Sequence, residues 1–420
     1  MALLFSAGTL SAAPMAEIGP KVDIDLRQAL EWALERDPGL KAGAHEIEAA
    51  DGRSIQAGLS PNPTVGIEVE DSLGTGGYRG FRRTQTTLQI SQLFELGGKR
   101  DRRVEAANAA RDVVRSDQEV RRLDVLAKTA EAYVGVLGAQ KRLAIAQERL
   151  KRTSALIPAL RKRVETGASA RVEITRGEVA ADLARIDVDR AKLGLETARR
   201  VLAAQWGSTM PDYRNALGDL ETAIAPPPIQ RLIDRLDDNP RLARWKTLRG
   251  AREADLQVQR SLATPDVTVG VGPRRYSESN DTGVVFSVSI PIPVNNRNQG
   301  SIIEAREELE KTGDEASAAR LDLYRDVSAA YGELASAWSE IDQLRNAVLP
   351  ASRAALKGVQ SGYGEGRFGV IDLLDAQGTL SDAEARYGEA LVSYHAAVAR
   401  IEGLNAGPID ALPSSKTTIH

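Results

Sequence analysis

Residues 363–377 read Tyr-Gly-Glu-Gly-Arg-Phe-Gly-Val-Ile-Asp-Leu-Leu-Asp-Ala-Gln. Four glycines fall between positions 362 and 369, and long alanine-rich runs with few glycines lie on either side. Glycine ends helices because it tolerates left-handed dihedral angles. The stretch therefore predicts a tight turn between two long helices. Asp372 and Asp375 are three residues apart, so they would share one face at the start of the second helix.

The same kind of turn occurs earlier, where residues 164–174 read Val-Glu-Thr-Gly-Ala-Ser-Ala-Arg-Val-Glu-Ile. Gly167 corresponds to Gly366 and Glu173 to Asp372, each at an offset of 199 (366 − 167 and 372 − 173). The chain is therefore expected to contain two copies of one arm, each ending in this turn.

Matching positions continue through both halves of the chain. The offset is 202 at the prolines (240 − 38 and 265 − 63) and 198 in the long helical runs (331 − 133). The change from 202 to 198 places a four-residue deletion in the second strand region. This self-similarity predicts an internal duplication. The matched pairs are Asp37-Pro38 with Asn239-Pro240, Pro63 with Pro265, Gly97-Gly98-Lys99 with Asn295-Asn296-Arg297, and Tyr133 with Tyr331.

Each half is predicted to run helix, strand, strand, long helix, turn, helix. Alternation with a period of two indicates strands over about 64–70, 84–94, 265–272 and 284–292. Long helices are expected over about 99–165 and 298–360, followed by helices over 172–206 and 370–404. A helix of roughly 60 residues would be about 90 Å long.

The chain divides into two structural repeats, over 17–215 and 216–405, and a C-terminal tail over 406–420. Residues 1–16 are apolar or small and uncharged, so they are predicted to be a signal remnant. The alternative is a frayed N-terminal segment. No later run reaches the roughly 18 apolar residues of a membrane-spanning helix. Any membrane crossing would therefore be made by β-strands.

The composition excludes several classes of function. A net charge of −3 over 420 residues argues against a general nucleic-acid binder. With no cysteine and three histidines, the chain has no disulfide, no thiolate site and no HExxH zinc motif. It also lacks a nucleophile–base pair, a phosphate-binding loop and a cluster of metal ligands. We therefore predict that the protein is not an enzyme and carries no cofactor or bound metal.

Four strands cannot close a barrel, and their edges cannot stay open in lipid. The apolar face and the small or polar face of each strand match a wall with lipid outside and water inside. Three chains would supply twelve strands and close the wall, with the helices continuing it as a tube. A soluble sandwich shows the same alternation. Two alternatives therefore stay open: a soluble periplasmic helical-hairpin adaptor and a structural coiled-coil protein.

Taken together, these motifs resemble the TolC-type outer-membrane factor family over residues 23–405. The likeness is greatest to its heavy-metal branch (CzcC/CnrC-like), which works with resistance-nodulation-division pumps. It depends on the duplication, the paired proline motifs, and Tyr363-x-x-Gly366 followed by Asp372-Leu-Leu-Asp375-Ala-Gln377. The resemblance implies a mostly α-helical, internally duplicated fold. A trimeric twelve-stranded membrane β-barrel, with four strands from each chain, would continue into a long α-helical periplasmic barrel.

The same resemblance implies a function and partners. The protein would be the exit duct of a tripartite efflux system in the bacterial outer membrane, with a periplasmic extension. It would be a passive channel for heavy-metal cations, gated at its periplasmic tip. Its partners would be two further copies of the chain, a periplasmic membrane-fusion adaptor, an inner-membrane resistance-nodulation-division pump and outer-membrane lipid, but no nucleic acid.

Residue roles at the tip are implied position by position. Phe368 stands where the family has a basic residue, with Arg367 beside it, so a different closing network is expected. By position, the tunnel constriction falls on Asp372 and Asp375, the gate-closing contacts on Tyr363 and Glu173, and the adaptor-docking tips on Gly167 and Gly366.

The two aspartates also have a simpler interpretation, because acidic residues near a helix N-terminus interact favourably with the helix dipole. Threefold symmetry weakens that interpretation. Six carboxylates converging on one axis would repel each other and attract cations, as carboxylate rings do in cation channels.

Overall fold

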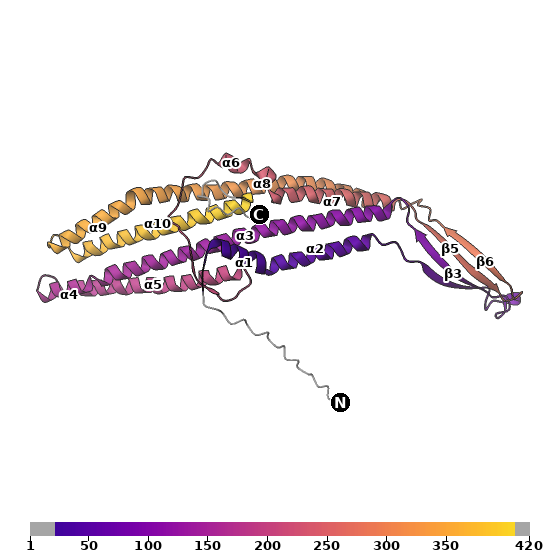
Figure 1. The fold of residues 1–420 in the computed structure, drawn as a ribbon, viewed down its shortest axis with the longest axis horizontal. Helices are drawn as coiled ribbons and strands as arrows, with labels where there is room; N and C mark the ends of the chain where they lie inside the picture. Colours follow the sequence, from indigo (N-terminus) through magenta and orange to yellow (C-terminus); the bar gives the residue numbers. More distant parts are fainter. Residues whose placement is uncertain (1–21, 408–420) are drawn as a thin grey trace, which may run out of the picture.

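A computed structural model describes residues 22–407 of the chain. These residues form a long rod, with a four-stranded sheet at one end and two helical hairpin tips at the other (Figure 1). The predicted signal remnant over 1–16 lies outside the described residues, as does the predicted tail over 406–420 apart from its first two residues.

The two halves of the chain repeat one order of elements. The first half contains β1 Val22–Ile24, α1 Leu26–Arg36, α2 Pro38–Ala57, β2 Thr64–Glu70, η1 Gly76–Tyr78, β3 Gln85–Phe94, α3 Lys99–Ser154, α4 Ile157–Glu165, α5 Val172–Ala204 and β4 Tyr213–Ala216. The second half contains α6 Ile229–Ile233, η2 Leu236–Asp238, α7 Pro240–Leu262, β5 Val267–Tyr276, β6 Thr282–Ser289, α8 Gln299–Gln343, the π-turn η3 Leu344–Val348, α9 Leu349–Gly364 and α10 Val370–Asn405. Among residues 22–407, no helix is both long and apolar enough to cross a membrane.

The repeated Asp-Pro and Asn-Pro motifs start α2 and α7. Asp37 Oδ1 accepts a hydrogen bond from the backbone N–H of Leu40 at 2.7 Å, and Asn239 Oδ1 accepts one from Arg241 at 2.8 Å. Proline suits the first helical position because its missing N–H would have no helical partner there. The repeated motif is therefore a repeated N-cap.

The sheet has the order β2-β3-β5-β6 and is antiparallel throughout. Apolar residues face each other across neighbouring strands, with Ile67 opposite Leu88 and Val271 opposite Phe286. In the single chain these side chains are exposed, at 72% for Ile67 and 78% for Phe286. Within the described residues, the edge strands β2 and β6 each pair on one side only. A sheet with an exposed apolar face and two open edges calls for a partner.

Two strand boundaries differ from the sequence prediction. The strand predicted over 265–272 extends to Tyr276 as β5, and the strand predicted over 284–292 is shifted to Thr282–Ser289 as β6. Pro291 and Pro293 end β6 because proline has no N–H to donate to a neighbouring strand. The loop between these strands therefore shrinks to residues 277–281.

Neither long helix is continuous. The helix predicted over 99–165 ends at Ser154 and resumes at Ile157, because Pro158 has no N–H for the carbonyl of Ser154. The helix predicted over 298–360 widens into the π-turn just before Pro350 and then continues to Gly364. We call residues 155–156 the first kink and residues 344–348 the second kink.

Residues with left-handed dihedral angles join the sheet to the long helices. Gly97 and Gly98 have φ angles of 71° and 70° before α3, and Asn298 has a φ of 58° before α8. Asparagine is among the few residue types besides glycine that adopt this conformation readily. The counterpart of Gly98 is thus Asn298, at an offset of 200 (298 − 98), and the predicted match to Asn296 at 198 is wrong.

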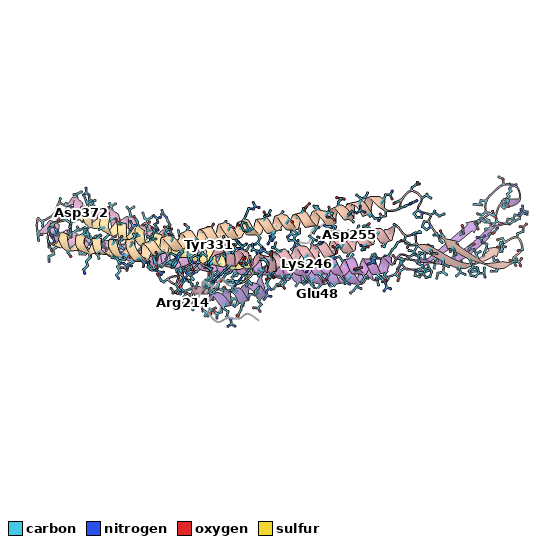
Figure 2. All side chains as sticks on the ribbon, turned by 90° about the horizontal axis from the view of Figure 1, so that it is seen from above. Glu48, Arg214, Lys246, Asp255, Tyr331 and Asp372 are labelled. Carbon is cyan, nitrogen blue, oxygen red and sulfur yellow. The ribbon has the colours of Figure 1, made fainter. Side chains whose placement is uncertain are left out.

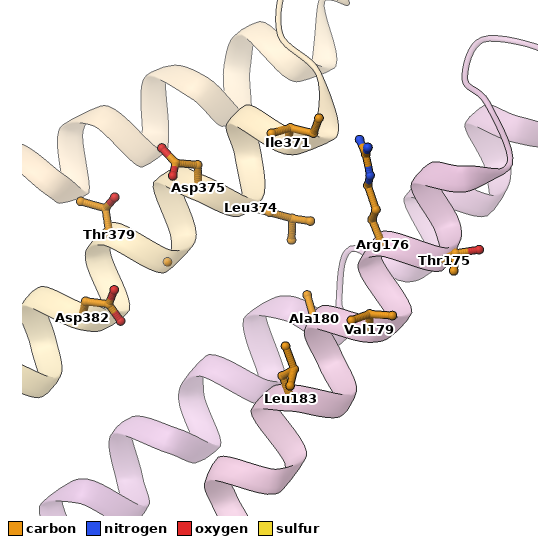
Figure 3. Close-up of a pocket in the computed structure, with 11 residues that line it drawn as sticks. Thr175, Arg176, Val179, Ala180, Leu183, Ile371, Leu374, Asp375, Thr379 and Asp382 are labelled. Carbon is orange, nitrogen blue, oxygen red and sulfur yellow. The ribbon is translucent and has the colours of Figure 1, made fainter.

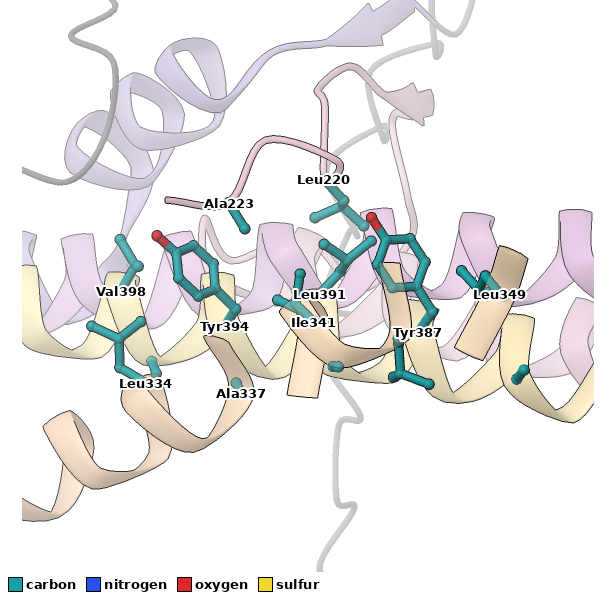
Figure 4. Close-up of a cluster of buried hydrophobic side chains, with 14 of the residues drawn as sticks. Leu220, Ala223, Leu334, Ala337, Ile341, Leu349, Tyr387, Leu391, Tyr394 and Val398 are labelled. Carbon is teal, nitrogen blue, oxygen red and sulfur yellow. The ribbon is translucent and has the colours of Figure 1, made fainter. Parts of the chain in front are cut away.

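Two hydrophobic cores hold the middle of the rod together. In one, Tyr133 of α3 is 2% exposed and donates a hydrogen bond to the carbonyl of Ile24 at 2.9 Å, beside the parallel pair of β1 and β4. The other joins α8, α9 and α10, with Leu391 and Tyr394 at its centre (Figure 4). Tyr331, the sequence counterpart of Tyr133, is only partly buried.

Candidate functional site

The two hairpin tips have the same backbone turn. Gly167 and Gly366 have φ angles of 71° and 77°. In each tip the residue after the glycine donates its N–H to a carbonyl five residues earlier, from Ala168 to Arg163 and from Arg367 to Gly362, both at 2.8 Å. This pattern is a Schellman motif, which requires the left-handed residue that glycine supplies best. The sequence correspondence at offset 199 is therefore a correspondence of turn geometry.

Asp372 lies at the end of the molecule farthest from the sheet (Figure 2), and Asp375 follows it by three residues in α10. Asp372 Oδ2 accepts a hydrogen bond from the backbone N–H of Gly369 at 2.8 Å and so caps α10. Both carboxylates are exposed, and neither has an ion-pair partner among the described residues. The capping contact accounts structurally for Asp372, whereas Asp375 has no such contact.

Asp375 lines a groove of about 750 Å³ between α5 and α10 (Figure 3). The walls are largely apolar, and Arg176 extends from α5 into the space between the helices. Asp382 lies seven residues beyond Asp375 on the α10 wall, so one helix face carries carboxylates along the groove. The apolar lining residues are Val179, Leu183, Ile371 and Leu374.

Arg163 connects the two tips of one chain. Its Nη1 donates to the carbonyl oxygen of Tyr363 at 2.7 Å, and its guanidinium carbon lies 4.5 Å from the centre of the Tyr363 ring. Its Nε donates to Ser169 Oγ at 3.2 Å. Such a cation–π contact is worth about 0.5–2 kcal/mol. Arg163 therefore joins α4 to α9, and sequence reasoning missed it because the family motif places the basic residue in the second tip.

Phe368 has a packing role in place of the family's basic residue. Its ring lies against Gly362, where a Cβ atom would collide with it. Arg367, beside it, forms an ion pair with Glu365 in the same turn. The basic side chain that joins the two tips is therefore Arg163, from the first tip. In the sequence, the only local sign of this contact was a basic residue, Arg163, placed four residues before Gly167 in the first tip.

Tyr363, which Arg163 contacts, is also within electrostatic range of Glu173. Tyr363 is 8% exposed, and burial raises the pKa of its hydroxyl, with Arg163 lowering it and Glu173 raising it further. The Tyr363 hydroxyl and Glu173 Oε2 are both buried, and neither has a hydrogen-bond partner in the described chain. The two residues thus interact electrostatically but without a direct hydrogen bond.

Comparison with known sequences decides the family. The sequence profile described as "Outer membrane efflux protein" matches residues 29–208 and 233–407. The chain belongs to the outer membrane efflux protein family. It is 32% identical to the cobalt-zinc-cadmium resistance protein CzcC of Cupriavidus metallidurans, over 89% of this chain and 87% of that protein. It is 28% identical to the nickel and cobalt resistance protein CnrC of the same organism, over 70% and 69% of the two chains.

Solved structures of other proteins share the fold of this outer membrane efflux protein. A crystal structure of CusC superimposes with a TM-score of 0.76 at 16% identity, covering 96% of this chain and 99% of that one. A membrane protein from Pseudomonas aeruginosa gives a TM-score of 0.75 at 19% identity, with the same coverage. The predicted fold, a helical tunnel joined to a β-barrel with internal duplication, is confirmed.

The comparisons also decide between the functions left open by the sequence. The TolC-type family and the heavy-metal branch are confirmed, and the outer membrane efflux protein is an exit duct rather than an enzyme. The alternatives of a soluble adaptor or a structural coiled coil are wrong. Family members such as CzcC and TolC are trimers that work with an adaptor and a resistance-nodulation-division pump.

Proposed function

We propose that three copies of this chain form the outer-membrane exit duct of a tripartite efflux system that exports heavy-metal cations. The likeness to the cobalt-zinc-cadmium resistance protein over 89% of the chain carries this proposal. The chain has no nucleotide-binding motif, so it is a passive duct and the energy for export comes from the inner-membrane pump. A periplasmic adaptor links the two.

Assembly as a trimer completes the open sheet. Strand β6 of one copy pairs with β2 of the next, so that three four-stranded sheets make twelve strands. Apolar side chains such as Ile67 and Phe286 then face lipid, and Gln89 and Arg274 face a water-filled interior. Loops 71–84 and 277–281 face the cell exterior, and the helical tips lie in the periplasm.

The tip supplies a gate for cations. On a threefold axis, Asp372 and Asp375 of three chains form rings of carboxylates that attract cations and repel each other. Arg163, together with Tyr363 and Glu173, holds the two tips of each chain together against this repulsion. The exposed turns at Gly167 and Gly366 are the surfaces that the adaptor contacts.

Conductance of the reconstituted trimer tests the gate. The double variant Asp372→Ala, Asp375→Ala should lose cation preference and divalent-cation block while the trimer stays intact. The matched control is Asp382→Ala, which removes the same charge from the same face about two helical turns away. It should leave preference and block unchanged. If the double variant keeps both properties, the constriction lies elsewhere in the tunnel.

Metal tolerance of whole cells tests the cargo. In a strain that lacks its own duct but keeps the adaptor and pump, the wild-type chain should restore growth on cobalt, zinc or cadmium salts. Restored export of an organic dye without restored metal tolerance would contradict the assignment to metal cations.

Cysteine labelling of intact cells tests the topology. The chain has no cysteine of its own, so a single introduced cysteine reports without background. An impermeant reagent should reach Gly76→Cys and Asn280→Cys in the exterior loops. It should not reach Gly167→Cys, and labelling at that tip would invert the proposed orientation.

A further inference from the structure

An arginine holds each kink of the long helices to the same turn of α10. Arg152 lies two residues before the end of α3 at Ser154, and Arg345 lies within the second kink. The segments beyond the kinks, α4 and α9, end in the two tips. The position of each tip therefore depends on what fixes its kink.

At the first kink, Arg152 is held by side chains of α10. Its Nη2 donates to Glu384 Oε2 at 2.7 Å and to Ser381 Oγ at 3.3 Å. Both ion-pair side chains are only 21% exposed. Water therefore screens this pair less than it screens an exposed pair.

At the second kink, Arg345 is held by α10 and by the loop that follows β4. Its Nε donates to Tyr387 Oη at 3.1 Å, and its Nη2 donates to the backbone carbonyl of Glu221 at 2.6 Å. The Tyr387 hydroxyl donates in turn to Glu221 Oε2 at 2.9 Å, and Lys141 of α3 donates to Glu221 Oε1 at 2.5 Å. Figure 4 shows Tyr387 on α10 close to Leu349, the first residue of α9. Four separate segments of the chain thus meet at the second kink.

The receiving residues of α10 form one continuous strip. Ser381, Glu384 and Tyr387 follow each other at intervals of three residues, so they lie along one side of the helix. They are 11 to 17 residues from Val370, the first residue of α10, or roughly 16–26 Å along the helix. Helix α10 is uninterrupted over its 36 residues, so this strip and the aspartates near its start belong to one rigid element.

We infer that Arg152 and Arg345 are positioning residues that couple both kinks to α10, so that the two tips of a chain open and close as a unit. The inference rests on the proposed gate at the tips. Without the arginines, each kink could bend by itself and the tips would separate independently. With them, a movement of either kink pulls on the same turn of α10 and is passed to the other kink.

Single-channel recording of the full-length trimer tests this coupling through a double-variant cycle. Arg152→Gln and Arg345→Gln should each raise the frequency of channel opening, by at least about fivefold if the coupling has the usual allosteric size. Combining them should raise the frequency by much less than the product of the two single effects, because both act through one element. A product of independent effects, or no effect, would overturn the inference.

The control is Arg386→Gln, on the same turn of α10. Arg386 forms an ion pair with Glu340 of α8, which lies four residues before the second kink. The Arg386 side chain is 72% exposed, against 21% for Arg152, and it has no contact with residues 344–348 or 155–156. It should leave opening unchanged. An effect as large as that of the kink variants would show that any lost charge on this turn loosens the channel, and would overturn the inference.

Lysine substitutions give a rescue that a merely structural role would not predict. Arg152 directs all of its contacts to α10: Nη2 donates to Glu384 Oε2 and Ser381 Oγ, and Nη1 donates to Glu384 Oε1 at 3.4 Å. A lysine ammonium can reach these two neighbouring side chains, so Arg152→Lys should keep the opening frequency near that of the wild type. Arg345 uses two nitrogens for partners on different segments, so Arg345→Lys should behave like Arg345→Gln. Equal rescue at both positions would contradict the assigned geometry.

Two milder variants replace the glutamines if those do not assemble. Glu384→Gln removes the charge that pairs with Arg152, and Tyr387→Phe removes the hydroxyl that accepts from Arg345. Both keep side-chain shape and weaken the same two links, so they should show a smaller effect that is again non-additive. Failure of the proposed gate is a separate result. In that case the double aspartate variant would keep its cation preference while the opening frequency still responded to Arg152 and Arg345.

Discussion

The two halves of the chain bend their long helices in different ways. At the first kink the carbonyl of Ser154 loses its helical donor, but Ala155 still donates to the carbonyl of Lys151, and Ala155 and Leu156 keep helical φ angles of −65° and −77°. At the second kink the helix widens, and the N–H of Leu349 bonds the carbonyl of Leu344 five residues earlier. A π-turn holds one residue more than an α-turn. A proline follows each kink, but only the second half absorbs an additional residue.

The kinks also lie at different distances from the tips. Pro158 precedes Gly167 by 9 residues (167 − 158), whereas Pro350 precedes Gly366 by 16 (366 − 350). The difference of seven residues is about 10 Å of helix. The duplication has therefore kept the turn and the order of elements but not the place where the arm bends. The two arms therefore have the same turn at their tips but interrupt their long helices at different distances from it.

Replacing the two matched tyrosines should give the largest difference in stability between the two halves. Tyr133→Ala removes a side chain that is 2% exposed, so we expect it to lower the free energy of unfolding by about 3–5 kcal/mol. Tyr331→Ala removes a partly exposed ring and should cost less than about 1.5 kcal/mol. Denaturant unfolding of the purified protein measures both. Tyr133→Phe, which removes only the hydroxyl, should cost about 1 kcal/mol. Equal costs for the two alanine variants would mean that the halves are packed alike.

The junctions between strand and helix should differ by a smaller amount. Gly97 has a φ of 71°, and a Cβ there would lie 2.8 Å from Thr264 Oγ1, whereas Gly98 has open space around it. Gly97→Ala should therefore cost about 2–4 kcal/mol, from strain plus overpacking, and Gly98→Ala about 1–2 kcal/mol from strain alone. Thermal unfolding compares them.

The control at the second junction is Asn298→Gly. It keeps the left-handed backbone but loses the hydrogen bond from Asn298 Nδ2 to the Gln259 carbonyl at 2.8 Å. Its effect should stay within about 1 kcal/mol. A larger loss than that of Gly97→Ala would show that the two junctions are held in unlike ways.

Replacing the two prolines should separate the kinks by their cause. Pro158→Ala restores a donor for the carbonyl of Ser154, so the first kink should heal with a gain of up to about 1 kcal/mol, which unfolding curves can measure. Pro350→Ala should leave the π-turn in place and stability nearly unchanged. Closing that turn would rotate α9 by about 100° and expose its buried residues Leu356 and Tyr363. A gain at Pro350 equal to that at Pro158 would contradict this distinction.

Acid should weaken the second kink slightly. Burial raises the pKa of Glu221, but hydrogen bonds from Lys141 and Tyr387 outweigh it and hold the pKa below its usual value of 4.5. A lowered carboxyl pKa stabilises the fold above pH 4.5, and this contribution is lost as pH falls through the lower value of the folded state. The thermal midpoint of the wild type should therefore fall below pH 4.5 more than that of Glu221→Gln. Parallel pH profiles would exclude a folding role for this carboxylate.

Much of the fold follows from short-range patterns that a sequence displays directly. Alternation with a period of two located all four strands of the sheet, because each strand has one apolar face. The recurrence of Asp37-Pro38 as Asn239-Pro240 marked matching points of the two halves, and glycine at the tips marked two turns, because glycine tolerates left-handed dihedral angles. The internal offsets revealed the duplication without any knowledge of contacts.

The tertiary structure decided which residues that are distant in the sequence come into contact. The pairing of Arg163 with Tyr363, the packing of Phe368 on Gly362, and the convergence of both kinks on one turn of α10 all join separate segments of the chain. No local periodicity encodes which segments meet, because that depends on how whole helices pack. The kinks themselves show the limit: the sequence determined that prolines stand at positions 158 and 350, and packing decided that one helix breaks while the other widens.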